Sequence, residues 1–129
     1  MVGSAILLEA CTGGDSQIRS SSNRYRAAVS RVVAAAFDVT AQDLHLPRRG
    51  RAKVALARQV AMYLAHVGLR LTLSDAGRLF RRDRTTAAHA CRLVEDLRDE
   101  HRFDCLMTIL EEMVLTEIVG RAAKVGTPS

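Results

Sequence analysis

The sequence has little of what membrane proteins, secreted proteins and aromatic-cored domains require. It contains no Trp, and aromatic residues make up 4% of its 129 positions, so Ala, Val and Leu must build the core. Its two prolines, at positions 47 and 128, leave nearly the whole interior free for helices. No run of about 18 apolar residues occurs, and no basic residue precedes the apolar patch near the N-terminus, which argues against a membrane span and a secretory signal. The three cysteines form no CxxC pair, which favours plain thiols in a reduced cytoplasm.

Residue groups that typify catalytic and metal sites are missing as well. The four histidines are scattered, without an HxxxH pair or a Cys partner at ligand spacing, so we expect no metal. No Ser-His-Asp or Cys-His constellation can be argued. No GxxxxGK[ST] phosphate loop is present, so we expect no ATP binding, no cofactor and no enzymatic activity.

The net charge of +5 is distributed unevenly along the chain. Residues 48–84 carry ten Lys and Arg against two acidic residues, whereas residues 85–117 carry three Arg against eight acidic residues. A generic soluble surface mixes the two signs. The basic half is therefore the expected face for a polyanion, and nucleic acid fits it best.

Hydrophobic periodicity predicts an all-α fold without strands or internal repeats. We expect helices at about 24–37, 52–67, 73–80, 84–100 and 103–119, and a short turn at 40–44. Side chains able to cap these elements are Asn23, Thr40, Thr72 and Asp83. The most apolar helix, 52–67, should lie at the centre of a bundle. Residues 23–119 then form one domain, while residues 1–22 and 120–129 are expected to be flexible, with Gly120 ending the last helix.

Residues 74–97 predict a short helix, a tight basic turn and a second helix. A helix N-terminus carries unpaired N–H groups and a partial positive charge, which suits it to a phosphate backbone when arginines flank it. Polar residues crowd this N-terminus: Arg81, Arg82, Asp83, Arg84, Thr85 and Thr86. Behind them a narrow apolar stripe recurs at helical spacing: Ala87, Ala90, Cys91, Val94 and Leu97. This build is typical of a helix-turn-helix recognition helix.

Two motifs in this region resemble the C-terminal DNA-binding domain (domain IV) of DnaA, the bacterial chromosomal replication initiator. The family run RDHTTVLHACRKIE stands here as RDRTTAAHACRLVE at 82–95. The family pattern PRQxAMxL stands here as ARQVAMYL at 57–64. The likeness covers roughly residues 24–102. It implies a helix-turn-helix bundle of about five or six helices, of the DnaA domain IV or Trp-repressor-like type.

The chain departs from the family pattern in the turn and before the Arg-Gln pair. The family's Gly-Gly-Arg-Asp-His turn is represented by RRDR at 81–84, without the glycines and with Arg in place of His. The proline before Arg-Gln is Ala57. Without a phosphate loop, the chain resembles the DNA-reading head of the initiator without its ATPase.

The resemblance also implies which residues touch DNA. Residues 83–86 would face the major groove, Arg58 and Gln59 would contact the backbone and nearby bases, and the basic loop at 47–51 would approach the minor groove. Which arginine of that loop enters the groove stays open. The expected DNA-binding residues are Arg48, Arg49, Arg51, Lys53, Arg58, Gln59, Arg81, Arg82, Asp83, Arg84, Thr85, Thr86 and His89.

Plainer interpretations remain for each feature. The helix at 84–100 could be an ordinary bundle helix, Thr85 and Thr86 could only support the Asp83 cap, and the loop at 47–51 could be a solvated linker. A lone His such as His89 is more often a packed or hydrogen-bonding residue than a catalyst. The adjacent arginines and the two matched motifs favour DNA binding.

We therefore expect sequence-specific binding to double-stranded DNA by a stand-alone regulator in the bacterial cytoplasm, associated with the nucleoid. It would act on transcription or on initiator-type (DnaA-box-like) sites near a replication origin. The alternative is a protein-interaction module that binds replication proteins and contacts DNA weakly. The last helix could serve as core, dimer face or partner site. Its apolar positions 106, 107, 110, 113, 114, 115 and 118 cover more than one face, so we expect a homodimer to form there.

Overall fold

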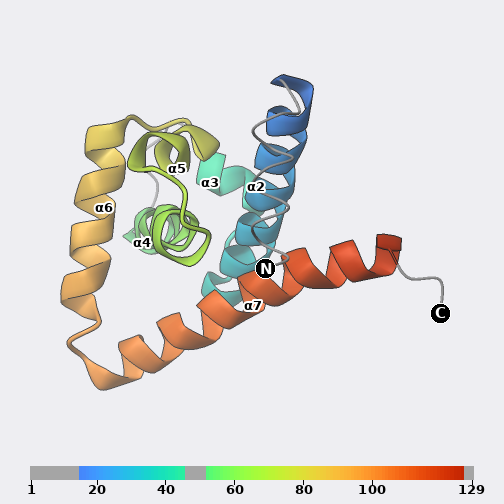
Figure 1. Cartoon of the computed structure of the whole chain (residues 1–129). Coiled ribbons are helices and arrows are strands. Elements are labelled where there is room, and N and C mark those ends of the chain that lie inside the picture. Colours follow the sequence, from blue (N-terminus) through green and yellow to red (C-terminus); the bar gives the residue numbers. More distant parts are fainter. Residues whose placement is uncertain (1–14, 46–51, 127–129) are drawn as a thin grey trace.

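The computed structural model of the chain describes residues 15–45 and 52–126, with side chains described for 22–45 and 52–120. These residues form helices and no strand: α2 (Asp15–Phe37), α3 (Ala41–His45), α4 (Ala52–Tyr63), the π-helical segment η1 (Leu64–Gly68), α5 (Leu73–Leu79), α6 (Arg84–Leu97) and α7 (His101–Gly126). Figure 1 shows α4 in the middle, with α6 on one side and α2 on the other. The expectation of an all-α helix-turn-helix bundle is confirmed.

The central position of α4 follows from its composition. Residues 60–65, at the end of α4 and the start of η1, are all at most 4% exposed, so this stretch is surrounded on every side. Small residues of α4 and α6, among them Ala57 and Ala87, are fully buried and let the two helices pack against each other. The largest fully buried side chains of the core are Phe80, Leu44, Met62, Leu64, Met107 and Leu110. Aliphatic packing therefore carries the fold, as the lack of aromatic residues predicts.

The two caps of the short elements form as expected. Thr40 and Asp43 bond reciprocally: the Asp43 N–H donates to Thr40 Oγ1 at 3.1 Å, and the Thr40 N–H donates to Asp43 Oδ2 at 3.2 Å. Thr72 Oγ1 accepts from the Asp75 N–H at 3.0 Å and starts α5. These side-chain oxygens accept hydrogen bonds from backbone N–H groups at the helix starts, which have no partner within the helix.

The start of the first helix and the end of the last helix differ from the expectation. Helix α2 begins at Asp15 rather than near Arg24, so residues 15–22 are helical and Asn23 lies inside the helix instead of capping it. Helix α7 continues through Gly120 to Gly126. Once a helix is nucleated, each added residue gains one hydrogen bond, so polar stretches without periodicity can extend it. Gly120 has no left-handed backbone conformation and therefore does not end the helix as a C-terminal glycine cap would.

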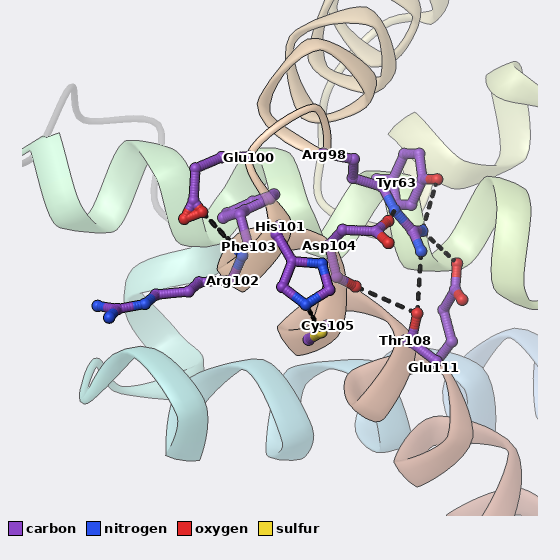
Figure 2. A network of polar contacts seen from close by, with 10 residues as sticks. All are labelled: Tyr63, Arg98, Glu100, His101, Arg102, Phe103, Asp104, Cys105, Thr108 and Glu111. Atoms are coloured by element: carbon purple, nitrogen blue, oxygen red, sulfur yellow. Dashed lines mark hydrogen bonds and ion pairs between the residues drawn. The ribbon is translucent and has the colours of Figure 1, made fainter.

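A cluster around Arg98 fixes the angle between α6 and α7. Arg98 Nε donates to Asp104 Oδ1 at 2.6 Å, and its Nη1 donates to Glu111 Oε2 and to the Tyr63 hydroxyl, both at 3.0 Å. Its Nη2 donates to Thr108 Oγ1 at 3.1 Å (Figure 2). Burial disfavours the charge of Arg98, but these hydrogen bonds outweigh it and raise its pKa above the ordinary value. One side chain thereby joins the end of α6, the end of α4 and the first three turns of α7.

Helix α7 is buried along one stripe only. Met107, Leu110 and Val114 are at most 2% exposed, whereas Met113 is 45% exposed. The exposed apolar residues of this helix are Ile109, Met113, Leu115 and Val119. At 100° per residue they fall on both flanks of the buried stripe rather than on one face of their own.

Two further findings concern the described residues as a whole. None of their helices is long and apolar enough to cross a membrane. Their His, Cys, Asp and Glu side chains nowhere gather in a group that could hold a metal ion.

Candidate nucleic-acid interface

The turn between α5 and α6 is held against Gly77. The N–H groups of Phe80 and Arg82 both donate to the Gly77 carbonyl oxygen, at 3.0 and 2.8 Å. A Cβ atom at Gly77 would lie 2.7 Å from the Arg82 carbonyl oxygen and 2.8 Å from that of Asp83. Real Cβ contacts are essentially never below 3.0 Å, so only glycine allows the turn to fold back this closely.

Arg81 gives the turn its direction. Its φ of 58° lies in the left-handed region, which ordinary side chains rarely adopt and glycine adopts freely. The family pattern has glycines in this turn, so this chain keeps a glycine-like backbone while carrying an arginine. The Arg82 Nη1 donates to the carbonyl oxygens of Phe80 and Arg81, at 3.4 and 3.2 Å, so its side chain also folds over the turn.

Asp83 caps the N-terminus of α6. Its Oδ1 accepts from the Thr86 N–H at 2.8 Å, as expected for the cap. The hydrogen bonds with Thr86 hold the pKa of Asp83 below its usual value, so the carboxylate is ionised at neutral pH. Because Asp83 is fully exposed, water screens its charge, and phosphate can approach the neighbouring arginines.

The first turn of α6 presents its polar side chains to solvent. Arg84, Thr85, Thr86 and His89 are all exposed. Arg84 makes no side-chain hydrogen bond or ion pair with any residue in the described ranges. The opposite stripe of Ala87, Ala90, Cys91 and Val94 is buried. The expected stripe is therefore confirmed except at its end, where Leu97 is 41% exposed because α6 ends there and the chain turns toward α7.

Arg58 is buried against the end of α3. It is 7% exposed, and its Nε and Nη2 donate to the carbonyl oxygens of Leu44 and Asp43, at 3.2 and 2.9 Å. Burial and the nearby Arg82 lower its pKa, against the effect of Asp43. The guanidinium thereby joins α4 to the end of α3, and a contact of Arg58 with DNA stays a prediction.

Two of the remaining expected residues belong to α4. Lys53 is exposed and stands 4.0 Å from Asp38, and Gln59 is half-buried. Arg48, Arg49 and Arg51 lie outside the described residues.

Sequence reasoning missed three features of this region. Gly77 shapes the turn, and a glycine within a short helical pattern often has a packing reason. Arg98 lies in an acidic stretch, but its partners Asp104 and Glu111 are 6 and 13 positions away, so no helical spacing marks them. The third feature, a group of arginines around His45, joins α2, α3 and α5, and no sequence spacing reveals it.

Comparison with known proteins agrees with this geometry. The family model described as the bacterial DnaA protein helix-turn-helix matches residues 27–94, more than half of the chain. The chain belongs to this family. The match begins inside α2 and ends near the end of α6, so the family's helix-turn-helix unit is the part of the chain that holds the capped turn.

Whole relatives of the DnaA helix-turn-helix family are much longer. The chromosomal replication initiator protein DnaA of Bartonella quintana (strain Toulouse) is 47% identical over 97 residues, which are 74% of this chain and 18% of that protein. The protein of the same name from Brucella abortus biovar 1 (strain 9-941) is 46% identical over 70 residues, or 54% of this chain and 14% of that protein. The chain thus spans less than a fifth of these relatives.

A solved structure extends the likeness to the fold. The crystal structure of a DNA replication initiation factor matches 89% of this chain with a TM-score of 0.69 and 25% identity, and 36% of that structure is covered. This share exceeds the range of the family model, so the similarity includes helices outside the helix-turn-helix unit.

Proposed function

We propose that this protein binds double-stranded DNA in a sequence-specific manner through the N-terminus of α6. The observation that carries the proposal is the exposed first turn of α6, with Arg84, Thr85 and Thr86 behind a capping Asp83. Helix-turn-helix proteins insert the N-terminal residues of the second helix into the major groove. Arg84 is free to donate two hydrogen bonds to a guanine, and Arg81 stands beside it for a phosphate.

The biological role we propose is regulatory. The similar proteins are replication initiators, which supports occupation of initiator-type sites near a replication origin, with regulation of transcription as the second reading. We propose that the protein acts as a stand-alone, nucleoid-associated regulator in the cytoplasm and that it neither binds ATP nor catalyses a reaction. Calorimetry on the pure protein tests the ATP part, since saturable micromolar binding would contradict it.

Selection of binding sites from random duplexes tests sequence reading. Arg84→His should change the preferred site at one or two base pairs, with a discrimination of about 1–3 kcal/mol, because His lacks the two-pronged donor of Arg. Arg102→His is the matched control, since Arg102 is exposed at the start of α7 and points away from the Arg98 cluster (Figure 2). If both variants select the site that the parent selects, Arg84 does not read bases.

The salt dependence of duplex affinity tests the basic face. Six phosphate contacts would give a log–log slope of about −5 between low and moderate salt, because counterions are released from the backbone. A slope near zero would contradict a docking surface built from arginines.

A second function, protein interaction through α7, is favoured by the exposed Ile109, Met113, Leu115 and Val119. We propose a homodimer in which two recognition helices read paired half-sites. Sedimentation at tens of micromolar, with and without DNA, checks it, and Leu115→Glu should dissociate the dimer. Arg102→Glu, at an exposed position in the first turn of α7, is the control. A monomer under all conditions would leave α7 as a packing helix.

A further inference from the structure

A pocket of about 330 Å³ lies where α2, α3 and α5 meet, and Arg81, in the turn before α6, lines its wall. Its lining is almost entirely cationic or titratable: Arg26, His45, Arg78, Leu79 and Arg81. Figure 1 shows α3 lying between α2 and the α5 end of the turn, which brings these distant segments together. We call this the Arg26 pocket.

The positive charges in the Arg26 pocket are poorly compensated. No acidic residue is among its lining. Arg78 Nη1 lies 3.3 Å from Asp75 Oδ1, but this ion pair is exposed and therefore weak. Arg81 makes no side-chain hydrogen bond or ion pair within the described part of the chain. The guanidinium groups that line this pocket carry like charges and repel one another, so the pocket favours binding of an anion.

Arg26 supplies the second observation. Its Nε is buried and finds no hydrogen-bond partner among the described residues. A buried donor without an acceptor costs free energy, and such an atom calls for an explanation in a native structure. Because Nε is buried, an oxygen-rich ligand in the pocket that Arg26 lines supplies this acceptor only once the Arg26 side chain shifts toward it.

His45 is held in place at the wall of the pocket. Its ring stacks on Phe80, with centroids 5.3 Å apart and planes 20° from parallel, and its Nε2 lies 3.4 Å from Ser30 Oγ. Burial lowers the pKa of His45, and Arg26, Arg81 and Arg58 lower it further. An anion nearby would favour the protonated imidazole and reverse part of this shift.

We propose that the Arg26 pocket binds a phosphate group through the guanidinium groups of Arg26, Arg78 and Arg81, with protonated His45 as a fourth donor. Planar guanidinium forks match the oxygens of phosphate, which is why arginines gather at phosphate sites. Arg81 stands two residues before the cap of α6, so the expected source is the backbone of a duplex docked on α6. A free phosphate-bearing molecule is the other source of the same chemistry.

The first experiment needs neither DNA nor a substitution. The pKa of each His ring is followed by NMR in inorganic phosphate and in sodium chloride of equal ionic strength. The pKa of His45 should be higher in phosphate than in chloride, and the ring signals of His101, exposed at the start of α7, serve as the reference for nonspecific effects of the salt. Equal His45 values in the two salts would overturn the proposal.

The second experiment removes the buried donor. In Arg26→Gln the difference between the two salts at His45 should disappear, whereas Arg102→Gln should retain it. Persistence of the full difference in Arg26→Gln would refute the assignment to this pocket. Thermal melts check that both variants are folded. If Arg26→Gln is unfolded, the comparison of the two salts in the unsubstituted protein decides whether the pocket binds phosphate.

The third experiment identifies the source. If the phosphate belongs to DNA, Arg26→Gln should weaken duplex binding and reduce the salt slope by about 0.9, the loss of one phosphate contact. An unchanged slope, with the His45 response to inorganic phosphate still lost, supports the pocket and assigns it to a free phosphate-bearing ligand. If the unsubstituted protein binds no duplex at all, the proposed function fails while the His45 measurement still decides the pocket.

Discussion

Adding one methyl group at Gly77 should disturb the helix-turn-helix unit more than any other single small change. The new Cβ would sit 2.7 and 2.8 Å from the carbonyl oxygens of Arg82 and Asp83. Both are backbone atoms in a turn whose own hydrogen bonds close on the Gly77 carbonyl, so neither can rotate away. To reach an ordinary contact of about 3.4 Å, the turn must retreat by about 0.7 Å (3.4 minus 2.7) and carry the cap of α6 with it.

The size of the effect follows from two opposing contributions. Forcing extra atoms into a packed site costs about 1–3 kcal/mol. Replacing Gly by Ala within a helix gains up to about 1 kcal/mol from propensity. The net loss in Gly77→Ala should therefore be up to about 2 kcal/mol in the free energy of unfolding. For a chain of this length that is a fall in Tm of up to roughly 10 °C.

The same substitution at Gly120 is the control. Gly120 also lies within a helix, but a Cβ there would meet nothing within 4 Å. Gly120→Ala should raise the free energy of unfolding by up to about 1 kcal/mol. Both variants add the same methyl group, but denaturant melts should show a loss of stability in Gly77→Ala and a gain in Gly120→Ala. If Gly77→Ala is as stable as Gly120→Ala, the close approach of the turn is not a real constraint.

Duplex affinity separates the two consequences of Gly77→Ala. Because the retreat of the turn moves Asp83 and the start of α6, DNA binding should weaken even at temperatures where the variant is fully folded. Gly120→Ala should bind duplex as the parent does. A destabilised Gly77→Ala with unchanged affinity would show that the turn adjusts without moving the recognition helix.

Three other predictions concern single side chains. Arg81→Gly should raise the free energy of unfolding by up to about 1 kcal/mol, because glycine tolerates the φ of 58° (checked by denaturant melts), while its duplex affinity should fall. Arg98→Met should lower the free energy of unfolding by about 2–3 kcal/mol, because two partly buried carboxylates lose their partner; a melt that matches the parent would contradict this. Burial, with a smaller contribution from nearby Glu95, raises the pKa of the Cys91 thiol to about 11. In a Cys11→Ser background, iodoacetamide at pH 8 should therefore alkylate the exposed Cys105 and leave Cys91 unmodified until the protein unfolds. Alkylation of both at equal rates would refute it.

Local signals in the sequence predicted most of the helices. Thr40, Thr72 and Asp83 precede apolar periodic stretches, and each forms the expected cap. A cap depends on residues three apart along the chain, so its geometry is already set by the sequence. The buried stripe of α6 followed for the same reason. The start of α2 and the end of α7 could not be predicted, because helix extension over polar residues leaves no periodic signal.

Long-range contacts account for what the sequence could not show. Arg58 carries the family's Arg-Gln motif, yet its position against the carbonyls of α3 depends on how α3 packs on α4. The Arg98 cluster joins residues 35 positions apart, from Tyr63 to Arg98. Charge patterning identified the basic half of the chain, but it could not distinguish an arginine on the surface from one used inside the fold.

Arg81 shows how the turn and the Arg26 pocket are connected. A non-glycine residue in the left-handed region costs about 1–2 kcal/mol, and such a cost persists only where the surrounding structure imposes it. Here the Gly77 carbonyl fixes the turn, and the left-handed residue, Arg81, lines the same pocket as Arg26. A glycine at this position would adopt the same backbone conformation, but the pocket would then have one cation fewer. The strain at Arg81 is therefore best explained by the anion that its side chain would help to hold, and the two measurements on Arg81→Gly, stability and duplex affinity, should change in opposite directions.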